Sequence, residues 1–178
     1  MAAFLLSILG KNRTGMVADV TRCLQAYAVN ISDSSMTSLR SAFTMMMVLE
    51  TPDDIDQQQF EQDLQGLEAC GLSLSLKALS PEEATASTPL PNYSLSVLGC
   101  DKTGIVYPFT ELLSAHGINL TDVNTRQLGG SSQPLYAMIM EMEIAADCDI
   151  AVFKQAVKQL GQDLSLDTNL HALETAAI

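Results

Sequence analysis

Two short glycine-flanked segments hold the residues of this chain that are best suited to bind a small ligand. Residues 10–15 read GKNRTG and residues 99–104 read GCDKTG. Glycine permits a tight turn and lets a ligand approach the backbone closely. Each segment is followed by apolar residues with helical spacing, so a helix is expected to begin there. The unpaired amides and the dipole at a helix N-terminus favour the binding of an anion. These segments could therefore bind a carboxylate, such as that of an amino acid.

An asparagine follows each segment at the same distance, at the start of an expected strand. These residues are Asn30 and Asn119, and their side-chain amides could hold a polar head group next to the glycine loop. Under the other interpretation, the glycines only form a turn and the asparagines only satisfy backbone groups. The residue pattern alone leaves both interpretations open.

Other residue types that carry out chemistry do not form a recognisable site. The first segment has the glycine spacing of a phosphate-binding loop, but Met16 and Val17 stand where that loop requires Lys and Ser or Thr. Neither His116 nor His171 is repeated in the other half of the chain, so no catalytic triad or dyad is indicated. The four cysteines lack the close spacing of metal ligands. We therefore predict no catalytic residue, no metal site and no cofactor.

The two glycine segments belong to an internal repeat. Residues 10–37 and 99–126 align without a gap, and nine of these 28 positions are identical. Because each copy is long enough for its own core, the repeat indicates a tandem duplication of one small domain. Residues 80–91 read SPEEATASTPLP, a proline-rich stretch without apolar period that indicates a linker. We predict a first domain over residues 1–79 and a second over residues 92–178.

Each copy is expected to contain a strand, a helix, two strands, a helix and a final strand. The expected strands cover residues 3–9, 29–37, 43–50 and 72–79 in the first copy, and 93–98, 118–127, 136–143 and 164–173 in the second. The first helix of each copy presents an apolar stripe to the core: Met16, Val17, Val20 and Leu24, matched by Ile105, Val106, Phe109 and Leu113. A second helix is expected over about residues 55–69, with a counterpart in the second copy. This order predicts the α+β ferredoxin-like fold, with both helices on one face of an antiparallel sheet.

The predicted sheets leave one face without helices. That face must be covered or wet, and apolar strands in two linked copies predict that the sheets join or stack, within the chain or between chains. From this sheet face we expect a homo-oligomer. As a separate feature, the second copy has four extra residues, which fall in the turn at residues 129–134.

Composition and charge limit the class of protein. The chain is 47% hydrophobic and 17% charged, which is typical of a globular protein. Its formal net charge is −12 and its nine basic residues are scattered, whereas direct nucleic-acid binding needs clustered Lys and Arg to neutralise phosphates. The sequence shows no membrane-spanning stretch, no signal peptide and no disulfide framework. We predict a cytoplasmic protein that binds neither nucleic acid nor membrane.

The sequence around each glycine segment resembles the start of an ACT domain. Residues 8–34 read ILGKNRTGMVADVTRCLQAYAVNISDS and residues 97–123 read VLGCDKTGIVYPFTELLSAHGINLTDV. The family pattern is a strand, a Gly-Lys/Ala-Asp-Arg-Pro-Gly loop, a helix and a Gly-X-Asn-Ile start of the next strand. The resemblance implies ligand-binding residues in both copies: Asn12, Arg13, Gly15, Met16, Asn30, Asp101, Lys102, Gly104, Ile105 and Asn119. Asn12 and Thr14 replace the usual Asp and Pro in the first copy, Thr103 replaces that Pro in the second, and Cys100 is also unusual. Either the copies differ in affinity or one of them is purely structural.

The family resemblance also implies a role. ACT domains bind small molecules, often amino acids, and regulate an attached enzyme or a partner. Two such domains with nothing attached are similar to the glycine cleavage system transcriptional repressor family, which acts through a DNA-binding partner protein. This implies a non-catalytic sensor of an amino acid such as glycine or serine that acts on transcription through a transcription factor. The alternatives are a ligand-free interaction module and a regulatory subunit of an amino-acid biosynthetic enzyme.

Overall fold

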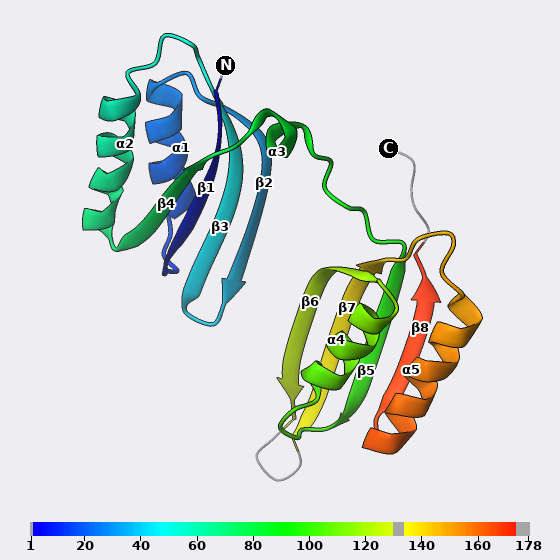
Figure 1. Cartoon of the computed structure of the whole chain (residues 1–178). Coiled ribbons are helices and arrows are strands. Elements are labelled where there is room, and N and C mark those ends of the chain that lie inside the picture. The colour runs from blue at the N-terminus through cyan, green and yellow to red at the C-terminus, as the bar shows by residue number, and fades with distance from the viewer. Residues whose placement is uncertain (1, 130–133, 174–178) are drawn as a thin grey trace. The chain divides into compact units, whose positions relative to one another are not determined.

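A computed structural model describes residues 2–129 and 134–173 and divides the chain into two compact units, residues 1–87 and 88–178 (Figure 1). The first unit contains β1 (Ala2–Lys11), α1 (Met16–Ala26), β2 (Asn30–Leu39), β3 (Ala42–Thr51), α2 (Gln57–Gly66), the short helix η1 (Leu67–Cys70), β4 (Leu72–Ala78) and α3 (Pro81–Thr85). Its strands form one antiparallel sheet in the order β2-β3-β1-β4. Both α1 and α2 lie on one face of this sheet (Figure 1).

The second unit repeats this architecture. It contains β5 (Tyr93–Cys100), α4 (Val106–Ala115), β6 (Asn119–Leu128), β7 (Leu135–Glu143), α5 (Ile150–Leu164) and β8 (Asp167–Ala172). The sheet order β6-β7-β5-β8 is the same as in the first unit, and all its pairs are antiparallel. The predicted α+β ferredoxin-like fold, repeated twice, is confirmed.

Strand alternation and helix periodicity build each core. On β3, every second residue from Phe43 to Leu49 is buried, and α1 buries Met16, Val20 and Leu24 against them. Phe60 of α2 is fully buried in the same cluster. Residues at equivalent positions fill the second core: Ile105, Phe109, Leu113, Met138, Met140, Met142 and Phe153. The structure thus buries most of the apolar stripes that the sequence predicts.

Several local expectations were wrong. Val17 and Val106 were expected on the inward stripes, but each is 37% exposed, because each directly follows an inward residue and so points about 100° away from it around the helix. Helix α5 continues to Leu164 and ends at Ser165, whose φ of 57 is left-handed, so β8 begins at Asp167 rather than at residue 164. The linker over residues 80–91 stays a prediction, and this stretch includes the short helix α3, which begins with a capping box. The four extra residues of the second copy were placed at 129–134, most of which lies outside the described residues.

The sheet face opposite the helices exposes apolar side chains in both units. Leu9 and Met46 of the first unit are 57% and 52% exposed, and their counterparts Leu98 and Ile139 are 42% and 49% exposed. In the described part of each unit the long helices lie on the other face; on this face of the first unit the short helix α3 contacts β1, and its Glu83 Oε1 lies 2.9 Å from Lys77 Nζ of β4. That this face is covered by a second sheet stays a prediction.

Candidate functional site

The first glycine segment connects β1 to α1 and is bound to the far end of β2. Gly15 caps α1 with a left-handed φ of 91, a conformation that glycine adopts without steric cost. The Asn12 amide N–H donates to the Ser41 carbonyl at 2.8 Å, and the Asn12 side chain donates from Nδ2 to Ser38 Oγ at 2.8 Å. The loop is therefore held in place by the C-terminal end of β2 and the β2–β3 turn.

A cavity of about 320 Å³ opens beside this loop. Its walls come from the loop and the first turn of α1 and from β2 and β3; they are Asn12, Arg13, Gly15, Met16, Val17, Ala18, Met36, Ser38 and Phe43. Four of the predicted ligand residues of the first copy, namely Asn12, Arg13, Gly15 and Met16, thus line one cavity. The sequence did not indicate Met36 and Ser38 as lining residues. The alternation of β2 places both on the helix side of the sheet, but the sequence does not show which end of β2 lies beside the loop.

The cationic group at this cavity is already paired. Arg13 Nη2 lies 2.8 Å from Asp19 Oδ2, and Arg22 Nη2 lies 3.4 Å from Asp19 Oδ1. Nη1 of Arg13 also donates to the Thr14 carbonyl at 3.3 Å, and the Arg13 amide N–H donates to Met16 Sδ at 3.2 Å. A ligand carboxylate that uses the Arg13 guanidinium would therefore compete with the Asp19 carboxylate. Asp19 was missed from the sequence, where it reads as an ordinary acidic residue near a helix N-terminus.

Asn30 does not lie next to the loop of its own unit, and that expectation was wrong. Both β1 and β2 are antiparallel to β3, and Lys11 and Leu39 both pair with Ala42. The loop therefore lies at the C-terminal end of β2, whereas Asn30 begins this strand and pairs with Glu50. Asn30 and Leu39 are the first and last of the ten residues of β2, and an extended strand of that length spans about 30 Å. Asn30 Nδ2 instead donates to Glu50 Oε2 at 3.1 Å.

The second glycine segment has the same arrangement with different charges. The Asp101 amide N–H donates to the Pro134 carbonyl at 3.0 Å, and Gln127 Nε2 donates to Asp101 Oδ2 at 2.7 Å. Gln127 is the counterpart of Ser38 in the repeat, so residue 101 joins its loop to β6 as residue 12 joins its loop to β2. Gly104 has a left-handed φ of 86 and Ile105, at the start of α4, is buried.

Lys102 and Asn119 are placed like Arg13 and Asn30. Pro108 stands where the first unit has Asp19, and Lys102 forms no ion pair with any residue in the described part of the chain. Asn119 begins β6 and pairs with Glu143, again at the end of the sheet away from its own loop. The two loops therefore differ in one respect that matters for binding an anion. A carboxylate already pairs with Arg13 in the first loop, whereas no described carboxylate pairs with Lys102 in the second.

The remaining polar groups that attract attention are structural. Tyr27 donates to Asp63 Oδ2 at 2.5 Å, and this bond raises the pKa of Tyr27 to about 12 and lowers the pKa of Asp63. His116 caps the end of α4 and packs edge-on against Phe153, with ring centroids 5.3 Å apart. Among the described residues, no three His, Cys, Asp or Glu side chains group as metal ligands. Within the same residues, no helix has the length and apolar character needed to cross a bilayer.

Sequence comparison identifies the repeated unit. Residues 2–77 match the family model described as the ACT domain. A UPF0237 protein of Methanosarcina mazei is 36% identical over 75 residues, which cover 42% of this chain and 78% of that relative. The chain belongs to the ACT-domain family. Since the second unit repeats the fold and the loop sequence of the first, this is a tandem ACT protein.

Two longer matches cover both units of the ACT protein. The glycine cleavage system transcriptional repressor of Escherichia coli (strain K12) is 25% identical over 175 residues, which cover 94% of this chain and 88% of that protein. The crystal structure of an unknown protein from Galdieria sulphuraria has a TM-score of 0.79 at 22% identity, covering 97% of this chain and 99% of that one. The first match relates the chain to a repressor over nearly its whole length, and the second supports the fold.

Proposed function

We propose that this tandem ACT protein is a non-catalytic, cytoplasmic regulator that binds an amino acid where the glycine loop of one ACT unit meets the Asn-bearing strand start of another. The other unit belongs either to the same chain or to a second copy. The observation that carries the proposal is the separation of about 30 Å between loop and Asn30 within one unit. A small ligand that uses both groups must therefore bridge two units.

The charges at the two ends of the sheet complement an amino-acid zwitterion. The loop end offers the amides at the start of α1 and the Arg13 guanidinium, which suit a carboxylate. The other end offers Asn30, whose Nδ2 donates to Glu50 Oε2, so that the Asn30 side-chain oxygen and the Glu50 carboxylate can accept from an ammonium. In the second unit the equivalent residues are Lys102 at the loop, and Asn119 beside its strand partner Glu143 at the strand start. Each end satisfies one half of the zwitterion, so the ligand favours assemblies that bring the two ends together.

A ligand that bridges two units can regulate the protein by changing how the units are arranged. A ligand shifts a conformational equilibrium only by its difference in affinity between the two states. An interfacial amino acid binds the joined arrangement better than the open one, and the joined arrangement would present a different surface to a protein partner. The similarity to a glycine cleavage system repressor over 94% of the chain supports a transcription factor as that partner and glycine or serine as the ligand. The scattered bases and the net charge of −12 favour a protein partner over DNA.

Thermal unfolding against the common amino acids, followed by calorimetry on any hit, tests the proposal. A ligand at about 100 times its dissociation constant stabilises the protein by about 2.7 kcal/mol. We expect a selective shift that is lost in Asn30→Ala or Asn119→Ala, and the pair of variants identifies which strand start contributes. Ser35→Ala is the matched control, because Ser35 is an exposed residue of the same edge strand, pairs with Met46 and lies away from both ends. If no amino acid stabilises the protein, a ligand-free interaction module is the better account.

A further inference from the structure

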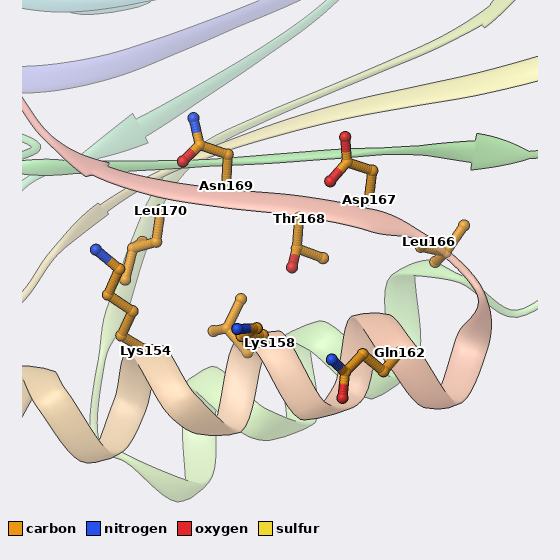
Figure 2. Close-up of a pocket in the computed structure, with 9 residues that line it drawn as sticks. Lys154, Lys158, Gln162, Leu166, Asp167, Thr168, Asn169 and Leu170 are labelled. Atoms are coloured by element: carbon orange, nitrogen blue, oxygen red, sulfur yellow. The ribbon is translucent and has the colours of Figure 1, made fainter.

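A second cavity lies in the second ACT unit, between α5 and the edge strand β8. Its volume is about 270 Å³. Figure 2 shows Lys154, Lys158 and Gln162 along α5, with Thr168 pointing toward the helix from β8. This groove is separate from the glycine loop, which lies at the N-terminal end of α4.

The groove combines an apolar floor with a cationic wall. Val157, Leu166 and Leu170 are at most 8% exposed and form part of the lining. Lys154 and Lys158 lie four residues apart on α5, which places them one helical turn apart on the same side of the helix. Gln162 and Thr168 supply polar atoms, and Asp167 and Asn169 of β8 also line the groove, with side chains that point away from α5 (Figure 2). Such a surface suits a ligand with an anionic head and a small apolar body.

Among the residues that the structure describes in the second unit, no carboxylate pairs with either lysine. Within the described residues, neither Lys154 nor Lys158 forms an ion pair or a hydrogen bond. Asp163, the nearest acid on α5, accepts a hydrogen bond from Gln159 at 2.8 Å, and Asp167 points away from the helix (Figure 2). Like charges one turn apart repel each other, so local helix stability does not explain this pair in a chain with a net charge of −12.

The first unit provides an internal comparison. Its equivalent groove, between α2 and β4, has about 130 Å³ and is lined by Leu6, Glu61, Leu64, Gln65, Leu74 and Leu76. The repeat aligns Phe60 with Phe153, so Glu61 and Gln65 stand in place of the two lysines. Glu61 accepts a hydrogen bond from Gln57 at 2.9 Å, which satisfies it within its own helix. The cationic groove is therefore a property of the second unit alone and not of the shared fold.

We propose that the groove between α5 and β8 binds a small organic dianion, such as a phosphate monoester or a dicarboxylate. The anionic head lies between Lys154 and Lys158, with the Thr168 hydroxyl and the Gln162 amide as further hydrogen-bonding partners. The apolar body rests on Val157 and Leu170. A free amino acid is a poor ligand here, because its own ammonium group would face two cations. The site is thus distinct in chemistry from the loop site.

Titration of the isotope-labelled full chain with inorganic phosphate and pyrophosphate, followed by amide NMR at low ionic strength, tests this site. We expect saturable shifts at residues 154–170, which sodium chloride at matched ionic strength does not reproduce. Lys154→Gln and Lys158→Gln should each weaken phosphate binding about fivefold, the effect of one unit charge at about 4 Å in water. Arg126→Gln removes one charge from an exposed position of β6 in the same unit and should leave the affinity unchanged.

The double variant Lys154→Glu/Lys158→Gln gives the groove the residues that the first unit carries at these positions. Because the same fold accommodates them there, this variant should fold and should lose the shifts at 154–170. Shifts that persist in the double variant, or that appear equally with sodium chloride, would overturn the proposal. Any anion effect on residues 99–104 is resolved separately in the same spectra and reports on the glycine loop instead.

Discussion

The left-handed backbone at Gly15 gives a quantitative test of how the candidate loop is built. Gly15 has a φ of 91, and a Cβ placed there meets no atom closer than Arg13 Nη1 at 3.9 Å. An alanine would therefore cause no clash, and its cost is conformational only. The left-handed region costs an L-residue about 1–2 kcal/mol, offset by about 0.4–1 kcal/mol from the reduced entropy of the unfolded chain. We expect Gly15→Ala to destabilise the first unit by about 1 kcal/mol.

Gly66 offers the matched control in the same unit. It has a right-handed φ of −55 at the end of α2, and a Cβ there meets nothing within 4 Å. The identical change, Gly66→Ala, should stabilise the unit by about 0.5–1 kcal/mol. The two variants should therefore differ by about 1.5–2 kcal/mol although both add one methyl group to open space.

Hydrogen exchange of slowly exchanging core amides measures this difference within the first unit. The amides of Leu6 and Met47, which are fully or almost fully buried on β1 and β3, report the free energy of opening of their unit. Gly15→Asn should lower the free energy of opening less than Gly15→Ala does, because asparagine tolerates the left-handed region. Equal opening free energies for Gly15→Ala and Gly66→Ala would refute the described loop conformation.

Three further predictions concern the Arg13 guanidinium, the core of the first unit and the loss of stability at acidic pH. Asp19→Asn frees the Arg13 guanidinium from its 2.8 Å ion pair, so a loop-binding carboxylate should bind up to about fivefold more tightly by calorimetry, the upper range for an exposed pair; weaker binding would contradict competition. Phe60→Ala removes a fully buried ring and should cost the first unit about 3–5 kcal/mol in urea unfolding, whereas a loss below 1 kcal/mol would contradict the described core. Tyr27→Phe removes the bond that lowers the pKa of Asp63. The stabilisation from this bond is present above the unfolded pKa of Asp63 and is lost as the pH falls through its lower folded pKa. The variant should therefore lose less stability than the wild type between pH 5 and pH 2. An unchanged dependence of stability on pH would refute the assigned Tyr27–Asp63 bond.

The sequence predicted the fold because its signals were local and repeated. Alternating apolar residues on β3 and β7, and the apolar stripes of α1 and α4, each specify an element and its buried face. The two copies gave the same order independently, so errors in one could be checked against the other. One error came from assigning the helical stripe one residue too many, at Val17 and Val106; the end of α5 at Leu164 was missed because periodicity does not mark where a helix stops.

The candidate site was predicted only in part, because a binding site depends on which ends of the elements meet. The loop residues Asn12, Arg13, Gly15 and Met16 line one cavity as neighbours in sequence should. The position of Asn30 could not be read from its spacing, since a strand of ten residues carries its first residue to the opposite end of the sheet. The ion pair of Arg13 with Asp19 also joins residues whose types alone do not distinguish a pair from two solvated charges.

In the proposed complex, one amino-acid molecule contacts a glycine loop and an Asn-bearing strand start that belong to different units. Nuclear Overhauser effects from a carbon-13-labelled amino acid, first selected by thermal unfolding, measure these contacts directly. We predict effects from the bound ligand both to residues 12–16 or 101–105 and to Asn30 or Asn119, which one unit alone cannot supply across about 30 Å. Contacts to a loop without any contact to either asparagine would contradict the account.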